Sequence, residues 1–329
     1  MKHLKFLWIA HFAVALCFAL GLAGYASAQS AYPSKPIKLV VGFAAGGPTD
    51  IVARAFADYT SQALGQPVIV ENKVGANSIL AAESVAAAPA DGYTLYMGAI
   101  NHSMTPALYA GRVKFDALKS FAPVCIMTVA PTVLVVGSGM NVKTLAAFMQ
   151  TVKNESGKRS FGTSGVGSSG HFFSEKFLTS QNLKMNHIPY KGSAPTVTDL
   201  IGGQLDSSFA TLGSVLSQIQ AGKLTALAIA MPKRAAQLPN VPTFAEAGVR
   251  GYTADAWYGL LAPAGTPAAI LQLLEKTSRQ FTELPATNTK FQAIGMETSS
   301  VCGGAFAQQL EREIKTYTKL AQDLNLKAE

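Results

Sequence analysis

The chain has 329 residues, of which 49% are hydrophobic and 14% are charged, and its formal net charge is +8. These proportions are those of a globular protein that is long enough for one large domain or two medium ones. Lys and Arg form no run longer than two and no stripe that alternates with aromatic residues. This pattern argues against a nucleic-acid-binding protein and favours small anions as binding partners.

The N-terminal residues have the pattern of a secretory signal peptide. Lys2 and Lys5 precede an almost entirely apolar run at 6–22, and a small-x-small cleavage site follows at 26–28. The apolar run is shorter than the roughly 20 residues that a membrane-spanning helix usually needs. We therefore expect a cleaved signal peptide at 1–28 and a mature protein outside the cytoplasm, where ATP and cytosolic NADH are not available. A retained membrane anchor is the alternative.

Segments of strand pattern and helix pattern then alternate along the chain. The run IKLVVGF at 37–43 predicts a buried strand, and Pro48 opens a helix that ends at about Leu64, before Gly65. Further on we predict strands at 67–70 and 93–98, a helix at 77–88 and a turn at 89–92.

The same alternation returns in the second half of the chain. An apolar, strand-like stretch at 122–136 leads from the first unit to the second. The second unit is predicted to contain strands at 159–163, 187–189, 205–210 and 224–230 and helices at 168–178, 194–201 and 212–220. Because strands that alternate with helices form mainly parallel sheets with helices on both faces, both units are predicted to be α/β.

The C-terminal tail has the pattern of three helices, at 267–281, 285–294 and 305–324, with few strands between them. Since helices without a sheet of their own must pack on an existing one, we expect the tail to return to the first unit. The predicted fold class is α/β with two lobes, each a mixed, mainly parallel sheet flanked by helices. A ligand cleft is expected between the lobes. We assign 29–130 and 252–329 to the first lobe and 131–251 to the second.

The loop after the first strand, FAAGGPTD from Phe43 to Asp50, has the composition of an anion-binding loop. Small residues let a ligand approach the backbone, and the following helix points free N–H groups and the positive end of its dipole at the loop. Equally, Gly46 and Gly47 could only shape a tight turn, with Asp50 capping the helix. The residues alone leave both interpretations open.

The loop that opens the second unit, FGTSGVGSSGH at 161–171, repeats this arrangement. Hydroxyl groups of Thr163, Ser164 and Ser168 add hydrogen-bond donors beside the start of a helix. The loop also contains GxGxxG. A dinucleotide-binding site requires an acidic residue about 20 positions beyond the glycines, and this chain has none at that position. Two such loops facing one cleft would suit a ligand with two carboxylates, although neither loop contains Arg.

The remaining reactive residues form no metal or catalytic pattern. Cys125 and Cys302 could pair in an oxidising compartment, but the sequence does not place them within bridging distance. His102, His171 and His187 are scattered and no CxxC is present, so no metal and no cofactor are expected. Since GxSxG is also missing, we expect no enzyme activity. A secreted hydrolase that uses loop Ser and His residues is the alternative.

Several segments, taken in order, resemble one known family. They are IKLVVGF with AAGGPTDIVAR, VGANSILAAESVAAAPADGYTL, NHSMTPALY, SFGTSGVGSSGHFFSEKF, PYKGSAPTVTDLIGGQLD, AGKLTALAIA, LPNVPTFAEAGV and WYGLLAPAGTP, over about 32–267. Their shared order is similar to that of the periplasmic substrate-binding receptors of tripartite tricarboxylate transporters, often called Bug receptors. The resemblance implies a type II-like periplasmic binding protein that closes on a small di- or aromatic carboxylate and delivers it to membrane permease subunits.

The resemblance also implies which residues hold the ligand. They are Phe43, Ala44, Ala45, Thr49, Asp50, Asn77, Ser78, Asn101 and His102 in the first lobe, and Thr163, Ser164, Ser168, His171, Tyr190 and Thr211 in the second. The chain departs from the family pattern near Ala45, where Pro is frequent, at 76–78, where Gly is frequent, and at 210–211, where Asp and Asn are frequent. These departures bear on the identity of the ligand. We expect a monomer, and a ligand sensor that feeds a signalling partner is a further alternative.

Overall fold

The computed structural model describes residues 32–252, 254–324 and 326. The signal peptide predicted at 1–28 lies outside the described residues. From Lys35 onward the described residues belong to one compact unit, and the following description refers to that unit. None of its described helices combines the length and the apolar composition that crossing a membrane requires.

Three parallel strands form the outer part of the first lobe. β1 (Ile37–Val41) lies between β2 (Val68–Asn72) and β3 (Thr94–Ala99). The connections between these strands contain α2 (Pro48–Leu64), the short turn η2 (Ala76–Ser78) and α3 (Ile79–Ala86), and α4 (Asn101–Tyr109) follows β3. Leu39, Val40 and Val41 are all buried, so β1 is covered on both of its faces, as in other α/β proteins.

Helix α2 begins and ends where its sequence signals predict. Pro48 occupies the first turn, where its missing N–H costs no intrahelical hydrogen bond, and Gly65 ends the helix in the left-handed conformation with φ 68°. Val52 and Phe56 form part of the buried face of α2, which contacts the sheet. The start of this helix, and with it the loop before it, is therefore fixed by packing.

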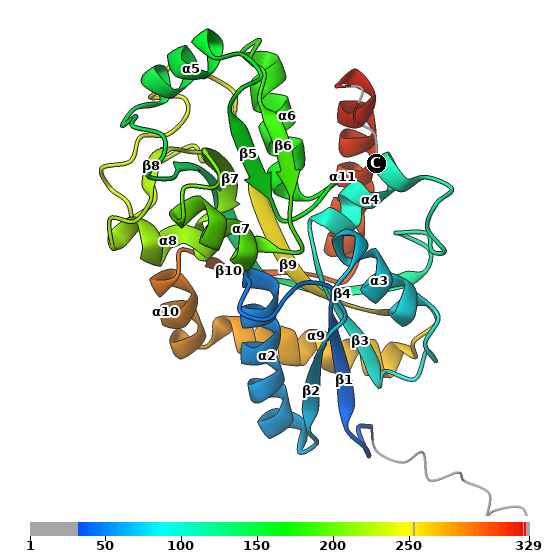
Figure 1. Cartoon of the computed structure of the whole chain (residues 1–329). Helices are drawn as coiled ribbons and strands as arrows, with labels where there is room; N and C mark the ends of the chain where they lie inside the picture. Colours follow the sequence, from blue (N-terminus) through cyan, green and yellow to red (C-terminus); the bar gives the residue numbers. More distant parts are fainter. Residues whose placement is uncertain (1–31, 253, 325, 327–329) are drawn as a thin grey trace, which may run out of the picture. The chain divides into compact units, whose positions relative to one another are not determined.

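Two long antiparallel strands join the lobes. The first part of β4 (Phe121–Val136) pairs with β9 (Asp255–Pro263), and β9 also pairs with β3 of the first lobe. From Thr132 to Val136, β4 pairs instead with two strands of the second lobe, β7 (Ser207–Thr211) and β8 (Thr225–Ile229). Hydrogen bonding between strands is thus continuous from one lobe to the other (Figure 1).

The second lobe repeats the parallel arrangement of the first. β5 (Ser160–Thr163) pairs in parallel with β6 (Asn186–Pro189) and with β7. The helices of this lobe are α5 (Leu145–Asn154), α6 (Ser169–Ser180), α7 (Ser193–Ile201) and α8 (Leu212–Gln220). The predicted fold class, α/β with two lobes of mixed sheet flanked by helices, is confirmed.

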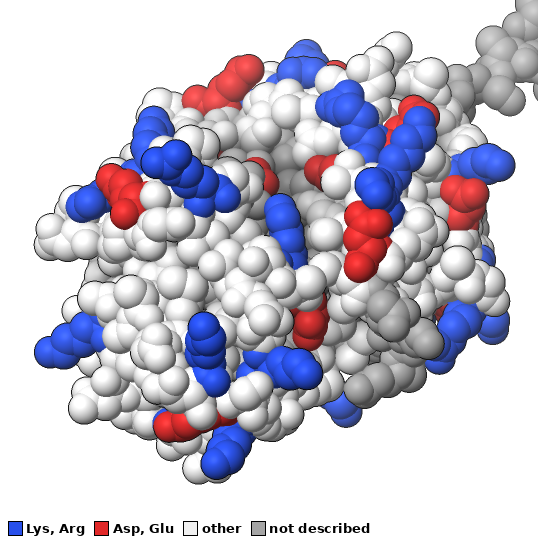
Figure 2. Space-filling model, turned by 90° about the horizontal axis from the view of Figure 1, so that it is seen from above, with Lys and Arg blue, Asp and Glu red and all other residues white. Residues whose placement is uncertain are grey.

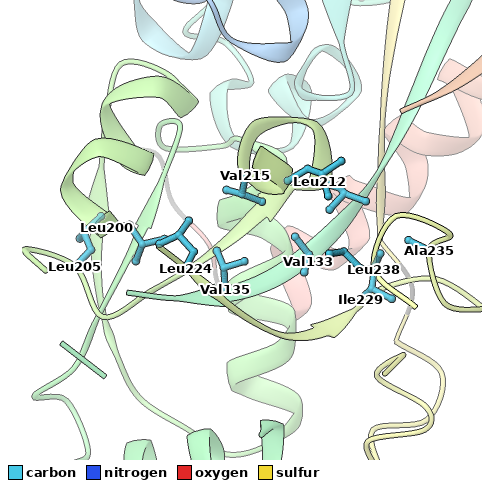
Figure 3. Packing of buried hydrophobic residues seen from close by; sticks show 11 residues of the cluster. Val133, Val135, Leu200, Leu205, Leu212, Val215, Leu224, Ile229, Ala235 and Leu238 are labelled. Atoms are coloured by element: carbon cyan, nitrogen blue, oxygen red, sulfur yellow. The ribbon is translucent and has the colours of Figure 1, made fainter. Parts of the chain in front are cut away.

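A cluster of aliphatic residues forms part of the core of the second lobe. Val133 and Val135 of β4 lie in it together with Leu200 of α7 and with Leu212 and Val215 of α8, and all are fully buried (Figure 3). Burial of one such side chain contributes about 1.5–3 kcal/mol. The cluster therefore holds α7 and α8 firmly against the sheet and fixes the positions of their N-termini.

The C-terminal segment packs against helices of the first lobe. It contains α9 (Ala268–Glu283), α10 (Pro285–Ala293), β10 (Glu297–Cys302) and α11 (Gly304–Asp323). α9 contacts α2, and α11 contacts α4, beside which it lies in Figure 1. Between its helices the segment adds one strand, β10, which pairs with β4 and so extends the existing sheet.

A disulfide ties the C-terminal segment to the strand that joins the lobes. Cys125 of β4 and Cys302 of β10 lie opposite each other in the antiparallel pairing and are bonded across a sequence separation of 177 residues. A crosslink that closes so long a loop restricts the unfolded chain strongly. The pairing that the sequence left open is therefore present, and it secures β10 at the edge of the sheet.

We predict that the double variant Cys125→Ala/Cys302→Ala has an unfolding free energy lower by about 2–5 kcal/mol than the wild type. Urea unfolding measures this difference. Reductant serves as the control, since it should destabilise the wild type and leave the variant unchanged. Coinciding unfolding midpoints of the two proteins without reductant would contradict a stabilising disulfide.

Candidate functional site

A cavity lies between the two lobes, at the carboxyl ends of β1, β3, β5 and β7. This main cavity encloses about 690 Å³, counting the space at its mouth. Parallel strands end at the same edge of a sheet, which is where ligands bind in open α/β folds. The lining consists of Phe43, Ala44, Gly47, Pro48, Thr49, Ala99, Ile100, Asn101, Ser164, Ser168, Ser169, Gly170, Ser193, Thr196, Val197, Ser208, Phe209, Ala210, Thr211, Ser214, Ala256 and Tyr258.

Five helices begin at the main cavity. The first residues of α2, α4, α6 and α7 line it, and so does Thr211, which directly precedes α8. The first turn of a helix has N–H groups without intrahelical partners and carries the positive end of the helix dipole. Each such terminus stabilises a nearby anion by about 0.3–1 kcal/mol, and by up to about 2 kcal/mol when partly buried. The main cavity therefore concentrates partial positive charge.

Full charges are missing from the lining that the described residues form, which contains no Lys, Arg, His, Asp or Glu. Its polar groups are backbone groups, hydroxyls and one amide. Burial raises the pKa of Tyr258 to about 12, although a hydrogen bond with Thr211 acts in the opposite direction, so the phenol stays protonated at neutral pH. On the outer face seen in Figure 2, Lys and Arg are interspersed with Asp and Glu rather than gathered in one patch.

Asp50 stabilises the loop at 43–50, the first-lobe loop, through hydrogen bonds. Its carboxylate accepts hydrogen bonds from Gly46 N–H at 2.9 Å, from Arg54 Nε at 2.8 Å and from Asn72 Nδ2 at 2.8 Å. Burial would raise the pKa of Asp50, but the hydrogen bonds from Arg54, Gly46 and Asn72 outweigh it, and the pKa lies below its ordinary value. Asn72 Nδ2 also donates to Phe43 O at 3.0 Å. Asp50 thus holds the loop and does not itself line the cavity.

The second-lobe loop, residues 163–168, is held by its own hydrogen bonds. Thr163 Oγ1 lies 3.1 Å from Gly165 O and 2.7 Å from His187 Nε2. Ser168 Oγ accepts a hydrogen bond from His171 N–H at 3.3 Å and so caps α6. These bonds fix the backbone that carries Ser164 and Ser168 at the main cavity.

The two lobes touch beside the main cavity. Tyr109 of α4 donates its hydroxyl proton to Val166 O at 3.3 Å. Gly167 has φ 77°, and a Cβ atom placed on it would lie only 3.2 Å from Asn77 Nδ2 of the first lobe. Glycine alone combines this backbone conformation with so close an approach. The second-lobe loop is thus in direct contact with the first lobe.

A second hollow, the side cavity, adjoins the main cavity, and Phe43 and Ser164 line both. Unlike the main cavity, it has two cationic side chains in its lining, Arg112 from the first lobe and Lys191 from the second. Its other lining residues are Gly42, Val74, Gly75, Ala76, Asn77, Ser78, Tyr109, Gly165, Val166, Pro189 and Tyr190. An elongated ligand could extend from the neutral cavity into this cationic one.

The predicted ligand contacts fall into three groups. Phe43, Ala44, Thr49, Asn101, Ser164, Ser168 and Thr211 line the main cavity, and Asn77, Ser78 and Tyr190 line the side cavity. Ala45, Asp50, His102, Thr163 and His171 line neither. His102 belongs to the core instead, where it is 1% exposed, its Nε2 lies 2.8 Å from Ala117 O, and its ring meets Phe121 edge-on. For all fifteen predicted residues, contact with a ligand stays a prediction.

Sequence reasoning missed several polar residues of the main cavity. Ser193 opens α7 directly after Gly192 and carries the same helix-start signal as Ser168, so it could have been found. Ser208 and Tyr258 lie within strands β7 and β9, and Ser214 lies in the first turn of α8. Only the arrangement of the strands brings these three side chains to the cavity, and no local signal predicts that.

Two lobes joined by antiparallel strands, with a cavity at the ends of their parallel strands, define a solute-binding protein with the periplasmic binding protein fold. The family model described as tripartite tricarboxylate transporter family receptor matches residues 52–326. The chain belongs to this family. It is 33% identical over 302 residues to protein BugT of Bordetella pertussis, and the match covers 89% of this chain and 91% of BugT.

Solved structures support the same assignment. The periplasmic binding protein BugD superimposes with a TM-score of 0.86 at 30% identity, covering 90% of this chain and 100% of BugD. Rpa4515 of R. palustris, solved with adipate, gives 0.87 at 32% identity over 90% of this chain and 100% of that one. MatC from Rhodopseudomonas palustris, solved with malate, gives 0.82 at 29% identity over 88% and 99%. BugD is a periplasmic binding protein, in agreement with the transporter-receptor family of this chain.

We predict that the unfolding free energy decreases as the pH falls from about 7 to about 5. Burial lowers the pKa of His102 to about 4 and that of His171 to about 4, below the value of about 6.5 in an unfolded chain. Between these pKa values the unfolded chain binds protons that the folded chain does not. Each histidine therefore contributes a slope of up to about 1.4 kcal/mol per pH unit, and stability present at neutral pH is lost on acidification.

Denaturant unfolding at several pH values between 7 and 5 measures this slope. The variant His102→Gln provides the comparison, because glutamine does not titrate and the slope should become shallower. A wild-type unfolding free energy that stays constant over this range would contradict histidines that are buried in the neutral form.

Proposed function

We propose that this chain is the solute receptor of a tripartite tricarboxylate transporter, that it captures a small dicarboxylate between its lobes and that it delivers this ligand to the permease subunits. The main support is the convergence of five helix N-termini on a cavity whose described lining has no charged side chain. Partial positive charges without a counter-charge favour a desolvated anion.

One carboxylate end occupies the main cavity in this proposal. It accepts hydrogen bonds from backbone N–H groups at the helix starts and from hydroxyls such as those of Thr49 and Ser164. A hydrogen bond to a charged partner contributes about 1.5–3 kcal/mol. A few such bonds suffice for a micromolar dissociation constant, which corresponds to about −8 kcal/mol.

The second carboxylate end reaches the side cavity, where Arg112 and Lys191 provide full positive charge. The shared lining residues Phe43 and Ser164 mark the passage from one cavity to the other. Adipate and malate, with which two similar proteins were solved, are both dicarboxylates, and this supports the assignment. Aromatic acids with a single carboxylate are the competing ligand class.

We predict that a dicarboxylate stabilises the purified protein against thermal unfolding and is not consumed. Adipate, malate, citrate, hexanoate and benzoate form a suitable screen, followed by calorimetry. At a hundredfold excess over the dissociation constant, the gain in unfolding free energy is about 2.7 kcal/mol. Hexanoate is the matched control for adipate, since it lacks only the second carboxylate. Chemical conversion of a screened compound would favour a hydrolase, and no stabilisation by any of the acids would refute the proposed ligand class.

We predict that Thr49→Ala and Ser164→Ala each raise the dissociation constant of the best dicarboxylate about tenfold or more, because each removes a donor to a charged group. Thr198→Ala is the control, since Thr198 is exposed on α7 and lies outside both cavities. Calorimetry gives the affinities, and thermal unfolding shows whether the fold is retained. Unchanged affinity in both cavity variants contradicts the placement of the carboxylate between these two loops.

We predict that Lys191→Gln weakens binding of a dicarboxylate but not of the monocarboxylate of equal chain length. The variant removes the positive charge from the side cavity and leaves the main cavity intact. Lys223→Gln, which removes an exposed charge outside both cavities, controls for the change in net charge. An equal loss for adipate and hexanoate would show that Lys191 does not contact the second carboxylate.

A further inference from the structure

Two histidines of the second lobe stack behind the loop at 163–168. His171 of α6 and His187 of β6 lie face to face, with ring centroids 4.1 Å apart and planes inclined by 9°. His187 also stacks on Phe161 of β5, with ring centroids 4.9 Å apart. Neither histidine lines the main or the side cavity, so direct ligand contact does not explain this arrangement.

The hydrogen bonds of Thr163 assign the proton of His187. A threonine hydroxyl has one proton to donate. Thr163 Oγ1 donates it to Gly165 O at 3.1 Å and accepts from Gly165 N–H at 3.3 Å. With this proton on Gly165 O, the contact at 2.7 Å to His187 Nε2 is donated by the imidazole. In this arrangement His187 carries its proton on Nε2, the tautomer that donates a hydrogen bond to Thr163.

The bond to Gly167 assigns the proton of His171. Gly167 N–H donates to His171 Nδ1 at 3.2 Å, so this ring nitrogen is an acceptor without a proton. Protonation there would place an N–H against an N–H and would remove the partner of Gly167. His171 must therefore be neutral, with its proton on Nε2, for the loop to keep this conformation.

The surroundings keep both rings neutral. Burial lowers the pKa of His171 to about 4, and burial together with the neighbouring His171 lowers that of His187 to about 3. Glu175, one turn further along α6, has a pKa that burial raises, which disfavours a counter-charge at this place. The pair thus presents one donor and one acceptor to the loop over the whole range of neutral pH.

We propose that His187 and His171 form a positioning pair that fixes the ligand-binding loop at 163–168 through one donated and one accepted hydrogen bond. The pair acts through Thr163 and Gly167, at either side of Ser164, which lines both cavities. The role in ligand affinity rests on the proposed function, in which this loop binds a carboxylate. The hold on the loop itself does not depend on any ligand.

Variants of His187 show whether its hydrogen bond positions the loop at 163–168 or whether its ring only fills space. The amide of glutamine in His187→Gln can donate from about the position of Nε2, whereas His187→Leu fills the space without a donor. We expect the dissociation constant of adipate or malate, whichever binds the wild type more tightly, to rise about tenfold in His187→Leu and less than about threefold in His187→Gln. Equal constants for the Gln and Leu variants would overturn the proposal.

Thr163→Val tests the same hydrogen bond from the side of the loop and serves if His187→Leu fails to fold. It should raise the dissociation constant by at least the same factor, because it also removes the two contacts between Thr163 Oγ1 and Gly165. Since the bond to His187 is already absent in Thr163→Val, the double variant Thr163→Val/His187→Leu should bind no more weakly than Thr163→Val alone. Additive losses would show that the two residues act independently and would overturn the proposal.

Amide hydrogen exchange of unliganded protein gives a readout that needs no carboxylate. Exchange in the segment at 163–168 should accelerate in His187→Leu and in Thr163→Val and stay at the wild-type rate in His187→Gln. Wild-type rates in all three variants would overturn the positioning role. If the wild type binds none of the acids, the proposed function fails, while the exchange experiment still decides whether the pair holds the loop.

Discussion

The hydrogen bonding of β4 into both sheets is the constraint on which the rest of the structure depends. Residues on the N-terminal side of Thr132 pair with β9 and β10, and those from Thr132 onward pair with β7 and β8. A change in the angle between the lobes must therefore twist β4 and β9 rather than bend a loose linker. The same strands place Tyr258 at the main cavity, so the geometry of the site depends directly on the strands that join the lobes.

Recognition of an anion without full charges depends on rigid support. Helix N-termini attract a carboxylate only when they all point at one place, and here packing fixes each start. The aliphatic cluster holds α7 and α8, the carboxylate of Asp50 holds the loop before α2, and the stacked imidazoles lie behind the loop before α6. The polarity of the site therefore arises from backbone geometry, which core residues set from a distance.

The sequence predicts those parts of the fold that have local signals. Pro48 and Gly65 delimit α2, and the small residues of the two loops mark the starts of α2 and α6. β9 was not predicted, although its apolar run resembles the run from which β1 was predicted, and α4 was not predicted because Pro106 lies inside it. The Cys125–Cys302 pairing also needs the sheet, since the partners lie far apart in the chain.

The sequence also predicts the candidate site only in part, because it does not give the direction of single side chains. Thr49 and Asn101 line the main cavity, whereas their successors Asp50 and His102 do not. In a helix, neighbouring side chains point about 100° apart, so a residue next to a lining residue usually faces elsewhere. Sequence similarity finds the segment that carries the site, but the direction of each side chain requires the helix to be placed in the structure.

The disulfide between β4 and β10 closes a covalent ring that contains the whole second lobe and β9. A single backbone cut anywhere between the two cysteines opens this ring without dividing the molecule. A protein nicked there keeps its full mass until the sulfur–sulfur bond is reduced. Exposed turns of the second lobe can thus be cleaved in an oxidising compartment while the two halves of the candidate site stay joined through the disulfide.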